Sequence, residues 1–132
     1  MRMSKFTTFL IILCLSAGAS LARADVPLGL WQSGPDATGT VVHVRTKPCG
    51  RALCGRVERA KDRRGYDTPS SAVGRKMLWD MMAQPDGTYE GKIWEPVGNR
   101  MLVAGMQVQG NTMQLRNCDA TACQDAVWTR LR

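Results

Sequence analysis

Short runs of hydrophobic and β-branched residues alternate with clusters of turn formers along most of the chain. Within such a run, a period of two places successive side chains on opposite faces of a β-strand. The runs predict strands at residues 29–33, 40–46, 53–60, 88–96, 100–109, 112–118 and 126–132. Turn formers separate them, as at residues 34–39, 85–87 and 110–111. The pattern predicts an all-β, antiparallel domain that closes into a barrel or sandwich to hide its edges.

Three features depart from this simple pattern. Residues 61–74 are polar and contain glycine, proline and serine, which predicts a loop. Residues 75–84 carry hydrophobic side chains at helical spacing, which predicts one or two turns of helix or an irregular lid. Gly105 lies inside a predicted strand and indicates a bulge or bend there.

The first 24 residues have the pattern of a cleaved signal peptide. Arg2 and Lys5 precede an apolar run at residues 6–19, and Ala22-Arg23-Ala24 fits the small residues that signal peptidase requires. The run is too short for a comfortable membrane span, although an uncleaved anchor is the alternative. The sequence therefore predicts a periplasmic or secreted protein, with residues 25–132 as one domain and no stable membrane anchor after cleavage.

Cleavage also changes the charge and the number of cysteines. The formal charge of +7 falls to about +4, because three of the 18 basic residues and none of the 11 acidic ones lie in the signal peptide. This mild excess does not indicate a nucleic-acid partner. It favours a solvated basic surface, with weak attraction to anionic envelope components as the alternative.

The remaining four cysteines form two pairs, each with four residues between its members: Cys49 with Cys54, and Cys118 with Cys123. An even number in an exported chain favours disulfides. Zinc would need reduced thiols, and a redox motif has two intervening residues. Because each pair flanks a predicted turn, we expect each to close its own hairpin, with crossed pairing as the alternative.

Several short motifs together resemble the domain-of-unknown-function 2147 family of exported bacterial proteins. They are GLW at residue 29, VVHV at 41, LCGRV at 53, GRKML at 74, YEGKIWEPVGNRM at 89, MQLRNC at 113 and AVWTRL at 126. The resemblance implies a small lipocalin-like β-barrel of about seven to eight strands and no established activity. It also implies that Gly29 and Trp31 lie on the first strand, with Arg130 of the last strand over the indole, which closes the barrel.

Catalysis has little support in the sequence. His43 is the single histidine, and no nucleophile motif, acid–base pair or glycine-rich phosphate loop accompanies it. We therefore predict a protein that is not an enzyme and uses no cofactor.

A methionine-rich set is the more interesting candidate for binding. Soft, adaptable side chains near a barrel mouth suit a small apolar ligand. The candidate ligand-binding residues are Trp79, Met81, Trp94, Met101 and Met106. Ordinary core packing and a Cu(I) site made by the methionines are the alternatives. A basic rim beside them, suited to an anionic head group or merely solvated, would contain Arg63, Arg64, Arg75 and Lys76.

These observations predict an exported binding module for a small apolar or amphipathic ligand. The alternative is a filled barrel that acts as a structural or interaction protein of the envelope, with a protein partner. The two differ in whether an apolar cavity or an exposed apolar patch is present.

Overall fold

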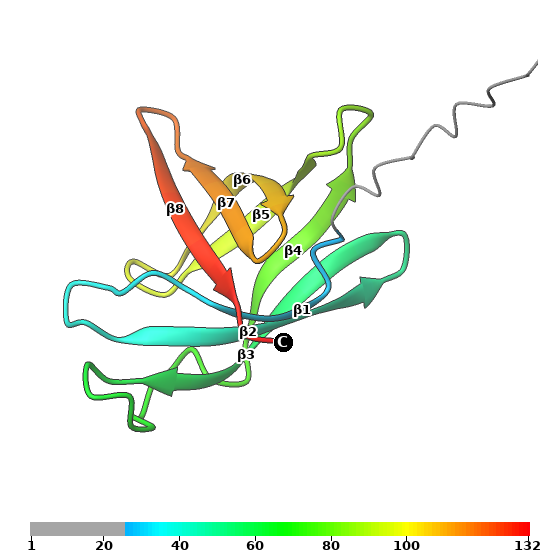
Figure 1. Cartoon of the computed structure of the whole chain (residues 1–132). Coiled ribbons are helices and arrows are strands. Elements are labelled where there is room, and N and C mark those ends of the chain that lie inside the picture. The colour runs from blue at the N-terminus through cyan, green and yellow to red at the C-terminus, as the bar shows by residue number, and fades with distance from the viewer. Residues whose placement is uncertain (1–25) are drawn as a thin grey trace, which may run out of the picture.

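The computed structural model describes residues 26–132, and the predicted signal peptide lies outside them. Eight strands follow one another: β1 (Gly29–Gln32), β2 (Val41–Cys49), β3 (Ala52–Lys61), β4 (Lys76–Ala83), β5 (Tyr89–Glu95), β6 (Arg100–Gln109), β7 (Thr112–Cys118) and β8 (Cys123–Arg130). Each strand pairs antiparallel with the next, and β1 pairs with β8, so the sheet closes into a barrel (Figure 1). The predicted fold class is therefore confirmed. Within residues 26–132 there is no helix of the length and apolarity that a membrane crossing needs.

The predicted helical lid is wrong, because residues 76–83 form strand β4. Met77, Leu78 and Met81 are buried, a spacing that imitates one face of a helix. In the structure this spacing arises from a shift of the β4–β5 register between Trp79 and Met82, where Asp80 has a φ of 51°. A bulge changes which residues face the core, so strict alternation is lost within a strand.

The bulge predicted at Gly105 is also absent. Gly105 lies opposite Glu90 of β5 and Arg116 of β7, in two pairings that run without a register shift. Register shifts occur instead in the pairings β2–β3, β3–β4 and β4–β5.

Buried side chains fill the interior of the barrel. Trp31, Val44, Met81 and Met113 have no exposed surface, and Leu78 and Leu115 are almost as fully buried. Together with the neighbouring apolar residues of every strand they form one hydrophobic core. Close packing of this kind leaves no room for a ligand among these side chains.

Arg130 closes the barrel between its first and last strands. Its guanidinium carbon lies 4.3 Å from the centre of the Trp31 ring. The guanidinium also donates hydrogen bonds to the carbonyl oxygens of Leu28 and Val26, the latter at 3.1 Å. Gly29 makes this approach possible, because its φ is 140° and a Cβ atom there would clash with the carbonyl oxygen of Arg132.

The two disulfides have the predicted pairing. Cys49 is joined to Cys54 and Cys118 to Cys123, with Cα–Cα distances of 5.5 and 4.1 Å. Each closes a hairpin, β2–β3 or β7–β8, and so restricts the unfolded chain by a short loop.

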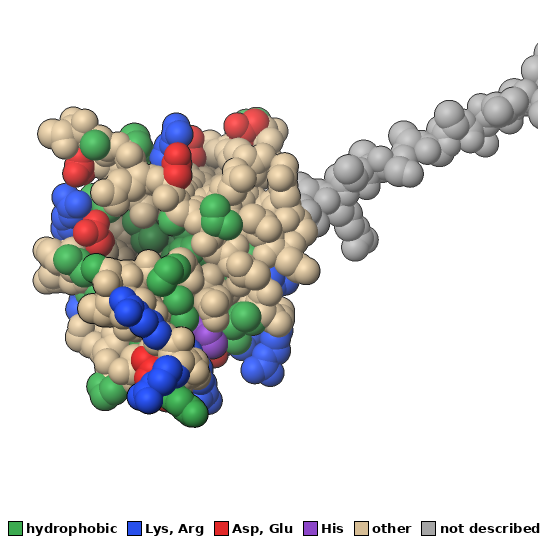
Figure 2. Space-filling view, turned by 60° about the vertical axis from the view of Figure 1, so that its left-hand side comes forward, with side chains coloured by type: hydrophobic (Ala, Val, Ile, Leu, Met, Phe, Trp, Pro, Cys, Tyr) green, Lys and Arg blue, Asp and Glu red, His purple; other side chains and the backbone are tan. Residues whose placement is uncertain are grey.

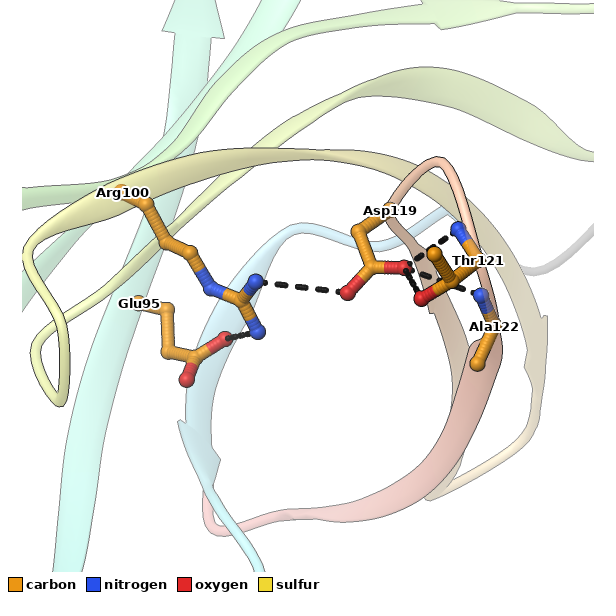
Figure 3. A network of polar contacts seen from close by, with 5 residues as sticks. All are labelled: Glu95, Arg100, Asp119, Thr121 and Ala122. Carbon is orange, nitrogen blue, oxygen red and sulfur yellow. Dashed lines mark hydrogen bonds and ion pairs between the residues drawn. The ribbon is translucent and has the colours of Figure 1, made fainter.

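A polar network holds the β7–β8 turn against the β5–β6 turn (Figure 3). Arg100 reaches Glu95 and Asp119, each at 3.3 Å. Asp119 in turn accepts hydrogen bonds from the backbone N–H groups of Thr121 and Ala122, at 2.8 and 2.9 Å. These hydrogen bonds, with that of the Thr121 hydroxyl, hold the pKa of the Asp119 carboxyl far below its usual range.

Candidate functional site

The structure separates the five candidate ligand-binding residues into two groups. Met81 and Met106 are buried in the core. Trp79, Trp94 and Met101 line one open groove of about 570 Å³, which we call the tryptophan groove. Its other lining residues are Arg56, Gly74, Arg75, Lys76 and Asn99.

The tryptophan groove lies on the outer side of β4, β5 and β6. Ile93 and Leu102 are opposite each other and buried, so they face the core. Because side chains alternate along a strand, the next pair, Trp94 and Met101, lies on the opposite face of the sheet. Met101 is 45% exposed, whereas Trp94 is only 5% exposed and belongs to the buried hydrophobic cluster, so it contributes an edge to the groove.

Both indoles of the groove carry a cation on one face. The guanidinium carbon of Arg75 lies 3.8 Å from the centre of the Trp94 ring, and Nζ of Lys76 lies 4.3 Å from that of Trp79. Each contact contributes about 0.5–2 kcal/mol, depending on its exposure to water.

Hydrogen bonds fix the orientation of both rings. The Trp94 indole N–H donates to Oδ1 of Asn99 at 2.8 Å, and that of Trp79 donates to the carbonyl oxygen of Lys76 at 3.0 Å. The groove therefore presents aromatic surface and positive charge in a fixed arrangement.

Among the residues that the structure describes, no carboxylate lines the tryptophan groove. In the described part of the chain, Arg56, Arg75 and Lys76 form no ion pair. Arg56 donates a hydrogen bond to the carbonyl oxygen of Gly74 at 2.6 Å, a contact that leaves its charge uncompensated.

Strand register places three cations in a row beside the groove. Arg56 of β3 lies opposite Arg45 of β2 on one side and opposite Lys76 of β4 on the other. Like charges directly opposite each other on neighbouring strands destabilise a sheet by about 0.2–1 kcal/mol per pair. Glu58 already forms an ion pair with Arg45, so an anion bound beside Arg56 and Lys76 would remove the remaining repulsion.

A cavity of similar size, about 560 Å³, lies against strands β5 to β8. Met106 and Leu115 line it but are each only 2% exposed, so the space lies outside the packed interior. Its charged lining residues are Glu90 and the ion pair between Arg116 and Asp125, at 2.9 Å, so both signs are present with a small excess of negative charge. Figure 2 shows a face of this mixed kind, where acidic and basic side chains surround a hollow with hydrophobic side chains at its base.

The described residues do not bring metal-ligating side chains together. Among them, no three His, Cys, Asp or Glu side chains are close enough to hold a metal ion. Met82 is 43% exposed while Met77 and Met81 are buried, so these three thioethers do not share one face. Nε2 of His43 lies 3.2 Å from Oε1 of Gln32, and burial lowers the pKa of the imidazole.

Arg75 and Lys76, from the predicted basic rim, line the tryptophan groove, whereas Arg63 and Arg64 do not. Sequence reasoning missed Arg56, Gly74 and Asn99. Asn99 lies between two predicted strands, and a single arginine in a strand carries no signal of its own. Their part in the site depends on strand register and on the path of the loop before β4.

The closed eight-stranded barrel with its arginine over a tryptophan is that of a lipocalin-like protein. A solved structure described as "Protein HP1028 from the human pathogen Helicobacter pylori belongs to the lipocalin family" is similar, with a TM-score of 0.62. It shares 14% sequence identity, over 80% of this chain and 82% of the other, which shows likeness of fold alone.

The chain belongs to the family described as "Uncharacterized protein conserved in bacteria (DUF2147)", whose model matches residues 29–130. A comparison with curated proteins finds no match.

Proposed function

We propose that this protein is an exported binding module for a small amphipathic molecule with an anionic group, held in the tryptophan groove and not inside the barrel. One observation carries the proposal: two oriented indoles and three cations line a single groove, and no carboxylate is among them. The apolar part of the ligand would lie on Trp79 and Met101, beside the edge of Trp94. The anionic group would contact Arg56, Arg75 and Lys76.

Two features support the export of the protein from the cytoplasm. Both pairs of described cysteines are joined in disulfides, which persist mainly in oxidising compartments. Residues 1–24 have the pattern of a signal peptide. In a bacterium this combination supports a location in the periplasm or outside the cell.

The test compares decyl phosphate with decanol, both below the concentrations at which they aggregate, by titration of tryptophan fluorescence. Decyl phosphate should bind more tightly, and added salt should reduce the difference, because screening weakens exposed charge interactions. Arg75→Gln should weaken the binding of decyl phosphate by up to about tenfold, which is the range expected for the loss of one hydrogen bond to a charged group.

Arg116→Gln is the matched control, because it removes the same charge from the cavity against β5–β8. It should leave binding unchanged. Equal affinity for decyl phosphate and decanol would overturn the proposal. Equal weakening by the two arginine variants would also overturn it, since the net charge and not the groove would then govern binding.

A second candidate is an interaction protein of the envelope, because the barrel interior is filled and some apolar side chains are exposed. Val97, Met101 and Val103 lie on or beside β6 and are 74%, 45% and 64% exposed. If this candidate is right, the native protein elutes from size-exclusion chromatography as part of a larger complex. The Val103→Lys variant then elutes as a monomer. Elution as a monomer from native extract would contradict this candidate.

A further inference from the structure

The tryptophan groove continues into a second groove of about 280 Å³. Arg56 and Lys76 line both. The second groove runs over β2 and β3 beside the first disulfide, and we call it the cystine groove. Its remaining lining residues are Arg45, Lys47, Pro48, Cys49, Cys54, Gly55 and Glu58.

The cystine groove holds more positive charge than its own carboxylate compensates. Glu58 is the single acidic residue in its lining, and it is bound to Arg45 at 2.5 Å. This hydrogen bond holds the pKa of the Glu58 carboxyl below its usual value, so the ion pair persists at neutral pH. Lys47 forms no ion pair among residues 26–132.

Lys47 also lies on the same face as the row of cations. It is two residues beyond Arg45 on β2, and side chains at that spacing point the same way. The Cys49–Cys54 disulfide, two residues further along, ties this end of β2 to β3. Lys47 is therefore held at the far end of a continuous basic path that begins at Arg75.

We propose that the ligand of the tryptophan groove carries a second anionic group, which Lys47 holds in the cystine groove beside the Arg45–Glu58 ion pair. This inference rests on the proposed function. One anionic group at Arg75 and Lys76 leaves Lys47 without an ion pair among residues 26–132, whereas two groups would supply a partner at both ends of the path. Strand β2 lies two interstrand spacings from β4, so the groups would be about 10 Å apart.

The ligand class is thus an amphiphile with two separated phosphate or carboxylate groups. The apolar part lies on the indoles, and the second anion points toward the disulfide. A soluble molecule with two phosphates offers the same anions without the apolar part, and the experiment distinguishes the two sources.

The experiment uses two probes that differ at one end. In both, a decyl chain is joined through a phosphodiester to a six-carbon linker, which ends in either a phosphate or a hydroxyl group. The phosphate-ended probe should bind about tenfold more tightly at low salt. Lys47→Gln should abolish most of that gain and leave the affinity for the hydroxyl-ended probe unchanged. Arg116→Gln, as the matched control, should change neither affinity.

The outcomes separate this inference from the proposed function. Equal binding of the two probes overturns the second anion site, while the proposed function stands if Arg75→Gln still weakens both. The second anion site is also overturned if Lys47→Gln weakens the binding of the two probes equally. Failure of both probes to bind overturns the proposed function itself.

Hexane-1,6-diyl bisphosphate, which lacks the decyl chain, tests whether the ligand needs an apolar part. It should bind more weakly than the phosphate-ended probe. Equal affinity would support the two-anion site and overturn the inference that the ligand is an amphiphile.

Discussion

Gly91 of β5 is a position where one methyl group should disturb both the fold and the proposed site. A Cβ atom added there would lie 2.5 Å from the carbonyl oxygen of Trp79 and 2.7 Å from that of Asp80. It would also lie 2.7 Å from Sδ of Met81. The two oxygens belong to the backbone of the β4 bulge, so they cannot move aside unless the bulge itself changes.

The expected cost of Gly91→Ala follows from these distances. Overpacking of a well-packed site costs about 1–3 kcal/mol. Replacement of a strand glycine by alanine returns about 0.5–1 kcal/mol, because the unfolded chain loses freedom. We therefore expect a net loss of about 1–2 kcal/mol in the free energy of unfolding. For a domain of this size that corresponds to a fall in Tm of roughly 5–15 °C.

Gly105→Ala on the neighbouring strand β6 is the matched control. A Cβ atom added there has no heavy atom within 4 Å beyond its chain neighbours, and its φ lies outside the left-handed range. The free energy of unfolding of the Gly105→Ala variant should be equal to that of the wild type or up to about 1 kcal/mol higher. Both variants are unfolded by urea with the disulfides intact, and the transition is followed by tryptophan fluorescence and circular dichroism.

The same variant links the bulge to the groove. The carbonyl oxygen of Trp79 is the atom closest to the added methyl group, so Gly91→Ala should displace the indole as well. Binding of decyl phosphate should weaken at temperatures where the variant is still folded. If Gly91→Ala is as stable as Gly105→Ala, the reasoning from close approach is refuted.

Three further predictions concern closure, pH and the disulfides. Arg130→Met should lower the free energy of unfolding by about 2–3 kcal/mol in urea titrations, because it loses the contact with Trp31 and charged hydrogen bonds. Arg116→Gln should leave the free energy of unfolding nearly unchanged, because its ion pair with Asp125 is exposed to solvent, and equal costs for the two variants would contradict this. Folding lowers the pKa of Asp119, so the hydrogen bonds of its ionised carboxylate stabilise the folded protein fully above the ordinary pKa of 3.8. This contribution is lost as the pH falls below that value toward the lowered pKa. Asp119→Asn should therefore show a shallower fall of Tm from about pH 5 to pH 2 than the wild type, and parallel curves would count against the turn hydrogen bonds. Replacement of Cys49 and Cys54 together by serine should cost about 2 kcal/mol, measured by the same urea titration, and no loss would mean that the short loop contributes nothing.

Local features of the sequence were enough for most of the secondary structure. Alternation and turn formers predicted seven of the eight strands, because both depend on residues close together in the chain. The disulfide pairing was predictable for the same reason, since only four residues separate Cys49 from Cys54 and Cys118 from Cys123. The lipocalin-like closure by Arg130 and Trp31 came from the family resemblance and not from periodicity.

Strand β4 was not predictable from its own residues. Its hydrophobic spacing fits a helix, and only the pairing with β3 and β5 makes it a strand. A bulge at Asp80 reconciles the spacing with the sheet, and the bulge in turn depends on the absence of a side chain at Gly91. Contacts with another strand therefore override the local pattern here.

The candidate site depends even more on tertiary structure. The sequence by itself determined the residue types, the turns and the short disulfide loops. It could not separate Met81 and Met106, which pack inside, from Trp79 and Met101, which line the groove. The row formed by Arg45, Arg56 and Lys76 exists only because register places residues of three strands side by side. Register is fixed by the packing of the whole barrel, so charges that are far apart in the chain become neighbours only in the folded protein.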